Sequence, residues 1–344
     1  MKSLPPITLP AMLALSVAGV PLSLLADATW TDTDGGVWSD TANWSTDPVL
    51  PSNDGTQNIT FNGSMTGTST VDANWSISGL TMDDGAGTIT IDASGGSILT
   101  LGSAGLVSNK TAGTTTFGSN LTLDLDADQT WSTAGSGNNG RIYLTSDLTG
   151  TGNVTMTGNS TLIVAGTTDT SGWSGSFTKD GGSVNFQGLL GNNPLGSQTI
   201  TLRNSTTVGF YFTHAGYGTL ANDIILEDVG TGRYTFPANI NAEIVFGGNI
   251  SSTSDLGESI DLYNGGSEPH PLRFTGDNSG LTSAKTFARH RPMTGRLTFV
   301  AQKSFWKTIM PSERITACMS NWGRIIQTLL MNVAVTYWQL IRTM

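Results

Sequence analysis

Along most of the chain, apolar residues alternate with small polar residues at a period of two. Such alternation is typical of half-buried β-strands, which present one apolar face and one polar face. Between residues 29 and 282, no stretch has the apolar spacing of a sustained amphipathic helix. The pattern predicts strands at Ile77–Met82, Thr88–Ile91, Ile98–Leu101, Leu121–Leu125, Val154–Met156, Leu162–Val164, Val184–Phe186, Ile200–Leu202 and Ile240–Phe246.

Clusters rich in Gly, Asn, Asp and Ser separate these segments and predict turns. Four such clusters occupy positions 84–87, 94–96, 135–140 and 180–182. The expected inward residues are small aliphatics and Thr, which suit a narrow coil stacked on its neighbours. We therefore predict an all-β chain folded as a right-handed parallel β-helix or β-solenoid. An array of β-sandwich-like units is the alternative fold.

The segment 1–28 is predicted to be a signal peptide. Lys2 supplies a positive start, positions 7–25 are apolar, and Ala26-Asp27-Ala28 has the small-x-small pattern of a cleavage site. We expect the mature chain to start near Thr29 and to be secreted or held at the cell surface. A transmembrane anchor is the alternative, and two prolines within the apolar stretch disfavour it.

Charge narrows the choice of partner. Up to Ala284 the sequence has 7 basic residues and 25 acidic ones. This excess of negative charge disfavours nucleic acid and anionic membranes as partners. No cysteine precedes Cys318, so the body cannot form disulfides and depends on burial and hydrogen bonding for its stability.

The chain changes character at Ser283. The segment 285–344 contains 9 of the 16 basic residues, a single acid at Glu313 and the only cysteine. A genuine basic tail, for instance with an amphipathic helix over Gly323–Arg342, is one explanation. An out-of-frame 3′ end is the other, and the abruptness of the change favours it. The tail is too short for an outer-membrane barrel, and we predict no transmembrane barrel in this chain.

One region carries a more specific pattern. The segment 148–158 has a Leu-x-Gly-x-Gly opening and an alternating strand, and the segment 166–177 follows with Ser-Gly-x-x-Gly. A partial second copy at 272–282 aligns on its Ser-Gly pair. The motif residues are Gly150, Gly152, Ser171, Gly172, Gly175, Ser279 and Gly280.

These motifs resemble the autotransporter-associated β-strand repeat. The resemblance implies an exported, β-helical, passenger-like protein, and it brings no catalytic residue with it. The resulting domain prediction is a signal peptide at 1–28, a tryptophan-rich cap segment at 29–62, solenoid repeats at 63–282 and the anomalous basic tail at 283–344.

Trp30, Trp38 and Trp44 resemble the tryptophan-rich segment that often precedes such repeats. Two interpretations are open for them. They form an aromatic platform that contacts glycans, or they cap the terminal coil, whose apolar side chains and backbone edge need cover. The cap is the favoured interpretation.

An enzymatic role is the alternative function, because parallel β-helices often act on polysaccharides. Glycosidases need two carboxyl groups flanking the scissile bond, and acids are too common here for their presence to decide. Asp124, Asp126 and Asp128 alternate with apolar residues, so they are expected to share one solvated strand face rather than chelate calcium. A lyase resembling pectate lyase would also need a basic residue close to clustered acids, and the basic residues Arg141, Arg203 and Arg233 are scattered singly.

The sequence therefore predicts no catalytic residue, no cofactor and no metal site. We expect a non-enzymatic structural or adhesive module whose partners are glycans or other surface proteins. A polysaccharide lyase or glycoside hydrolase remains the alternative.

Overall fold

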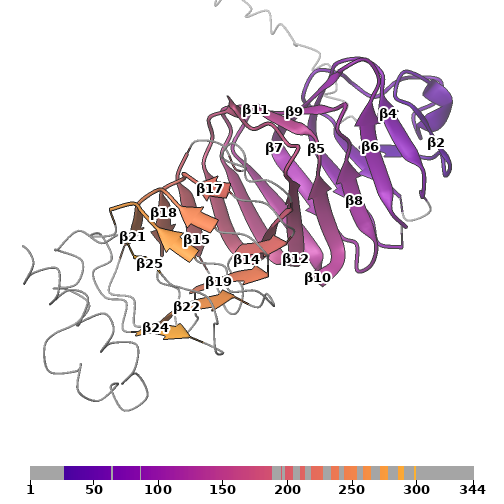
Figure 1. Ribbon diagram of the computed structural model, residues 1–344. Coiled ribbons are helices and arrows are strands. Elements are labelled where there is room, and N and C mark those ends of the chain that lie inside the picture. The colour runs from indigo at the N-terminus through magenta and orange to yellow at the C-terminus, as the bar shows by residue number, and fades with distance from the viewer. Residues whose placement is uncertain are drawn as a thin grey trace, which may run out of the picture.

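The fold was obtained as a computed structural model, shown in Figure 1. It describes residues 27–62, 65–85, 87–187, 195, 198–203, 210–213, 218–227, 234–239, 244–253, 259–264, 272–277, 286–289 and 298–299. These residues form 25 β-strands and one short 3-10 helix, η1 (Thr41–Asn43). Almost the whole predicted signal peptide, positions 1–26, and most of the predicted tail lie outside the described residues.

The strands stack in parallel into a β-solenoid, which confirms the predicted fold class (Figure 1). The first ladder of paired strands runs β1 (Ala28–Trp30), β3 (Asn58–Phe61), β5 (Trp75–Met82), β7 (Ile98–Ser108), β10 (Gln129–Leu144), β12 (Val154–Ala165), β14 (Phe177–Gln187), β15 (Ile200–Arg203), β18 (Ile224–Leu226) and β21 (Ile250–Ser252).

A second ladder uses the carboxyl-terminal parts of β10, β12 and β14. Its other strands are β2 (Gly35–Val37), β4 (Thr68–Val71), β6 (Ile89–Ala93), β8 (Thr114–Phe117), β16 (Phe210–Thr213), β19 (Tyr234–Asn239), β22 (Ser259–Asn264) and β24 (Thr286–Arg289).

A third ladder joins the amino-terminal parts of β5 and β7 to β9 (Thr122–Leu125), β11 (Asp147–Gly150) and β13 (Gly172–Trp173). A separate four-stranded parallel sheet contains β17 (Gly218–Leu220), β20 (Ile244–Phe246), β23 (Leu272–Phe274) and β25 (Thr298–Phe299). Because every strand-to-strand pairing of the described residues is parallel, the β-sandwich alternative is wrong.

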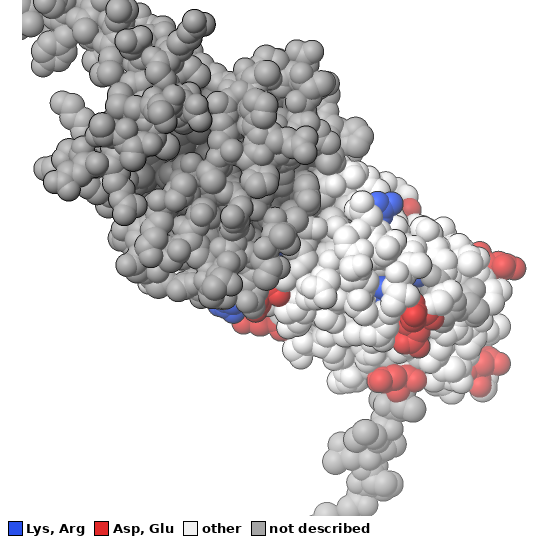
Figure 2. Space-filling view, turned by 90° about the horizontal axis from the view of Figure 1, so that it is seen from below, with Lys and Arg blue, Asp and Glu red and all other residues white. Residues whose placement is uncertain are grey.

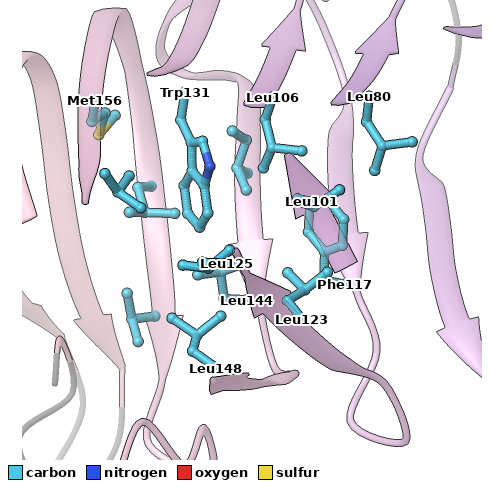
Figure 3. Close-up of a cluster of buried hydrophobic side chains, with 14 of the residues drawn as sticks. Leu80, Leu101, Leu106, Phe117, Leu123, Leu125, Trp131, Leu144, Leu148 and Met156 are labelled. Atoms are coloured by element: carbon cyan, nitrogen blue, oxygen red, sulfur yellow. The ribbon is translucent and has the colours of Figure 1, made fainter. Parts of the chain in front are cut away.

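Alternation decides which side chains enter the core. On neighbouring strands of the first ladder, Leu106, Trp131 and Met156 are paired in register, one on each coil. All three are almost completely buried, and Figure 3 shows them beside Leu80 and Leu125. A single coil cannot cover its own apolar side chains, so each coil depends on its neighbours for burial.

The predicted strands within the described residues are confirmed, but two of the four predicted turns are not separate turns. Positions 135–140 lie inside β10, and positions 180–182 lie inside β14. Positive φ angles at Gly137, Gly140, Gly181 and Gly182 let a strand bend around a corner without ending. A glycine cluster therefore marks a bend here, and it does not always interrupt the ladder.

The described strands cross two of the predicted domain boundaries. Ala28, the last residue of the predicted signal peptide, begins β1, pairs with Ile59 and is fully buried. Beyond Ser283, β24 pairs with β22 and β25 pairs with β23. Parallel pairing thus continues past the position at which we expected solenoid patterning to stop.

Candidate functional site

The predicted tryptophans gather at the amino-terminal end of the solenoid. The ring centroids of Trp30 and Trp44 lie 4.8 Å apart, and those of Trp38 and Trp44 lie 5.4 Å apart, both with edge-to-face geometry. Trp75 also belongs to the cluster, with its ring centroid 5.4 Å from that of Trp38. Edge-to-face contact is a favoured geometry for aromatic pairs and adds to the stabilisation by burial.

The exposure of these rings separates the two interpretations of the tryptophans. Trp30 and Trp38 are 0% exposed and Trp44 is 2% exposed. The Trp38 indole N–H donates to Ser69 Oγ at 2.6 Å, and that of Trp44 donates to the Trp38 carbonyl at 2.8 Å. A sugar platform needs an exposed ring face, and none of the three rings offers one. The burial of the three rings supports the cap interpretation.

The same segment covers the free edge of the first ladder. An isolated antiparallel bridge joins Trp30 and Trp44. Beside it, the Thr31 N–H donates to the Asn43 carbonyl and the Ser45 N–H to the Thr29 carbonyl, both at 2.8 Å. An uncovered parallel edge would present unpaired backbone groups to any other strand. The described cap therefore satisfies both the apolar end and the β1 edge of the terminal coil.

The predicted repeat-motif glycines stand where one coil touches the next. A Cβ at Gly152 would lie 2.1 Å from the Ala127 carbonyl oxygen, and one at Gly175 would lie 2.0 Å from the Gly152 carbonyl oxygen. Gly150 has a φ of +98°, and a Cβ there would lie 2.4 Å from the Leu125 carbonyl oxygen. These glycines are therefore required by the close stacking of the corners.

Of the remaining motif residues, two are exposed and two lie outside the described part of the chain. Ser171 and Gly172 are exposed, and the Ser171 N–H donates to Asp169 Oδ1 at 2.8 Å. Ser279 and Gly280 lie outside the described residues. In the second copy the structure places Gly276 at a stacked corner, where its Cβ would lie 1.9 Å from the Gly248 carbonyl oxygen.

A ladder of polar side chains, which the sequence pattern did not predict, runs along the same corner. Asp128 Oδ1 accepts from the N–H and the Nδ2 of Asn153 at 2.9 and 2.8 Å. Asn153 Oδ1 in turn accepts from the N–H and Oγ of Ser176 at 2.9 and 2.7 Å. Further along the solenoid, Asp223, Asn249 and Asp277 form the same kind of chain. An Asp, Asn or Ser directly before a strand was the available sequence signal.

The three acids at 124–128 do not share a strand face, so that expectation is wrong. Asp124 lies on β9 and accepts from Thr100 and Thr149 at 3.2 and 3.1 Å. Asp126 and Asp128 follow the strand, in the corner. Within the part of the chain that the structure describes, no group of three or more His, Cys, Asp or Glu side chains could hold a metal ion.

Several carboxylates act as local hydrogen-bond acceptors. The Thr56 hydroxyl and N–H lower the pKa of Asp54, and the Thr111 N–H and hydroxyl lower that of Asp84. The Ser171 N–H does the same to the pKa of Asp169. Hydrogen bonds to the charged form favour ionisation. A general acid needs the opposite shift, so these three carboxyls are poor candidates for that role.

Two lysines lie inside the solenoid. Lys179 is 1% exposed, and burial lowers its pKa to about 8 against the opposing attraction of Asp180. Lys110 is fully buried and donates to the Gly87 carbonyl. Burial lowers the pKa of Lys110 as well, while the Asp84 carboxylate raises it. Neither burial was predicted, because a lysine side chain seldom lies fully inside a protein.

Acidic groups are spread over the described surface. Figure 2 shows carboxylates at several places on one face, with few basic side chains among them. At the carboxyl end of β15, Arg203 lies between Asp180 at 3.8 Å and Glu227 at 2.5 Å. Arg141 on β10 donates to Thr114 Oγ1 at 2.9 Å. Both of these arginines therefore have a structural partner.

No protein-family model, curated protein or solved structure matches the chain. In the described residues, no helix has the length and apolarity required to cross a bilayer.

Proposed function

We propose that this chain is a secreted or surface-displayed β-solenoid with a structural or adhesive role and without catalysis. Its motifs resemble those of autotransporter passengers, which are exported β-helical proteins. The observation that carries the proposal is the parallel solenoid, closed at one end by a buried tryptophan cap. Such stacking creates a long, regular surface, which is the usual basis of recognition in solenoid proteins.

The polar side chains support a structural role. Asp128, Asn153 and Asp223 hold neighbouring coils together through side-chain to backbone hydrogen bonds. Asp124 is engaged by two threonines of the adjacent coils. These carboxylates are fixed in position by hydrogen bonds between coils, and they do not converge on a common site where a substrate could bind.

The sequence of the segment 1–28 supports export, and the acidic surface suits a protein that must remain soluble outside the cell. Glycans and other surface proteins are the proposed partners. Because Trp30, Trp38 and Trp44 are buried, a bound glycan would have to contact outward-facing polar residues instead.

Expression of the full chain in a bacterium with two membranes tests the proposal. We expect the protein to be digested by protease added to intact cells or to be found in the medium. A matched chain lacking the segment 1–26 should stay in the cytoplasm. Purified protein should bind whole cells or immobilised glycans without shortening soluble polysaccharides. Cytoplasmic retention of the full chain, or release of new reducing ends, would contradict the proposal.

A further inference from the structure

The outward side of the first ladder carries a regular array of hydroxyl groups. Thr130, Thr155, Thr178 and Thr201 are paired in register on β10, β12, β14 and β15. Ser132 and Thr157 form a shorter parallel column two positions further along. We call these side chains together the threonine face: Thr130, Ser132, Thr155, Thr157, Thr178 and Thr201.

The core fixes the spacing of this array. The residues between the two columns, Trp131 and Met156, point inward and are buried. Adjacent strands lie about 4.8 Å apart, and alternate positions along a strand lie about 6.6 Å apart. Threonine also has few χ1 rotamers, so its methyl and hydroxyl groups stay in place. The face is therefore a rigid two-dimensional lattice of small groups.

The hydroxyls of the threonine face are open to solvent partners. Among the described residues, no hydrogen bond engages the side-chain oxygen of any member of the face. Thr100 and Thr149, which face outward on the third ladder, instead donate to Asp124. The threonine face thus keeps its hydroxyl groups for water or a ligand.

Charge and aromatic side chains are absent from this part of the described surface. The partly exposed outward positions on β3, β5 and β7 of the same ladder are also uncharged, and they are Asn58, Thr60, Thr81 and Val107. The first charged group of the column is Asp180, next to Arg203. The bulky rings of this ladder, such as Trp131 and Phe177, point inward. A sugar-binding site would use aromatic faces, and this array has none.

We propose that the threonine face binds the ordered water of an ice surface. Evenly spaced hydroxyls and methyls can hold a layer of water molecules in a repeating pattern, and bridging water gives hydrogen bonds nearly as favourable as direct ones. Charged groups would disturb such a layer because they hold their own hydration strongly. The inference rests on the proposed function for the location of the protein outside the cell, but its test does not.

Ice growth in solutions of the purified full-length chain tests the inference. We expect faceted crystals, a freezing point below the melting point, and enrichment of the protein in slowly growing ice. Thr155→Lys and Thr178→Lys should remove most of the gap between the two temperatures. Thr155→Val keeps the shape and the methyl group but replaces the hydroxyl with a second methyl, and it should reduce the gap while leaving the thermal unfolding midpoint nearly unchanged.

Thr90→Lys and Thr116→Lys are the matched controls. These threonines also face outward and are partly exposed, but they lie on the second ladder. Both variants should keep the ice activity of the unchanged protein. Folded protein with no effect on ice would overturn the inference, as would an equal loss in the control variants. Surface display measured in the same strain separates this failure from failure of the proposed function.

Discussion

Lys179 pairs in register with Met156 of one neighbouring coil and with Leu202 of the next. An ammonium group thus occupies a position that apolar side chains fill on both adjacent coils. Met156 and Lys179 are each 1% exposed, and Leu202 is fully buried. Removal of a charge from water is costly, so this lysine opposes folding while it is protonated.

Lys179→Met should stabilise the protein at pH 7. Burial lowers the pKa of Lys179 from 10.5 to about 8 in the folded state. Each pKa unit corresponds to about 1.4 kcal/mol, so the gain in the free energy of unfolding should reach about 3 kcal/mol at most. Urea unfolding of the two proteins at pH 7 measures this difference. Thr178→Met, which places the same side chain on the outward face, should show no comparable gain.

The same shift predicts a pH dependence. Below the folded-state pKa of about 8 the lysine is charged in both states, so the whole penalty is present. Between that pH and 10.5 the unfolded state binds more protons, so the stability of the unchanged protein rises with pH. Its disadvantage relative to Lys179→Met should therefore shrink across that interval. A constant difference between pH 7 and pH 10 would contradict a buried, charged Lys179.

Gly175→Ala should destabilise the solenoid strongly. Its Cβ would lie 2.0 Å from the Gly152 carbonyl oxygen and 2.5 Å from the Trp173 indole nitrogen. Separation of two coils to make room should cost about 3 kcal/mol. Gly95→Ala is the control, because nothing lies within 4 Å of that site and its cost, about 1 kcal/mol, comes from its φ of +70° alone. Equal losses in denaturant unfolding would refute the stacking argument.

Asn153→Ala should weaken the hydrogen bonding that connects three neighbouring coils. The change removes the acceptor of two bonds from Ser176 and a donor to Asp128. These bonds are exposed to solvent, so we expect a loss of about 1–2 kcal/mol in the free energy of unfolding. Asn138→Ala, at an exposed position of β10, should have almost no effect. Thermal and urea unfolding of both variants give the comparison.

Trp38→Ala should disrupt the amino-terminal cap. The change leaves a large cavity and deprives Ser69 of its hydrogen-bond partner, at a cost of about 3–5 kcal/mol. Loss of the cap also uncovers apolar side chains, so binding of a hydrophobic dye and self-association should increase. Val49→Ala, at a residue 65% exposed, is the control and should change neither stability nor association. A stable, monomeric Trp38→Ala protein would show that the tryptophan cluster is dispensable.

Export should leave Asp27 as the first residue of the mature protein. Cleavage after Ala28 would remove a fully buried residue that pairs with Ile59 in β1. Cleavage after Ala26 keeps β1 whole and satisfies the preference for a small residue before the cut. Mass spectrometry of the exported protein distinguishes the two termini. A first residue at Thr29 would mean that β1 tolerates the loss of its first position.

Period-two alternation was sufficient to predict the strands, because inward and outward positions differ in polarity at nearly every rung. The small size of the inward residues then favoured the solenoid over a sandwich. The corners were harder to predict. The clusters that contain Gly137 and Gly181 have the composition of chain-reversing turns, yet the strand continues through both of them. Whether a glycine bends a strand or ends it depends on the neighbouring coil, which the local sequence does not contain.

The candidate sites show the same limit. The tryptophan cap could be predicted, since an open terminal coil needs bulky cover. The burial of Lys179 could not be predicted from residue type, although its place between Thr178 and Asp180 gives it an inward position by alternation alone. The threonine face could not be predicted either, because its members are separated by a whole coil in the sequence. Only the strand register places them side by side.

The sequence intervals from Leu106 to Trp131 and from Trp131 to Met156 are equal, so these two neighbouring turns of the solenoid are units of the same length. Duplication or deletion of one such unit would leave every remaining side chain on its original face and would lengthen or shorten the molecule by a single strand spacing. Gene rearrangements that insert whole units can therefore change the reach of this protein without redesigning its interior.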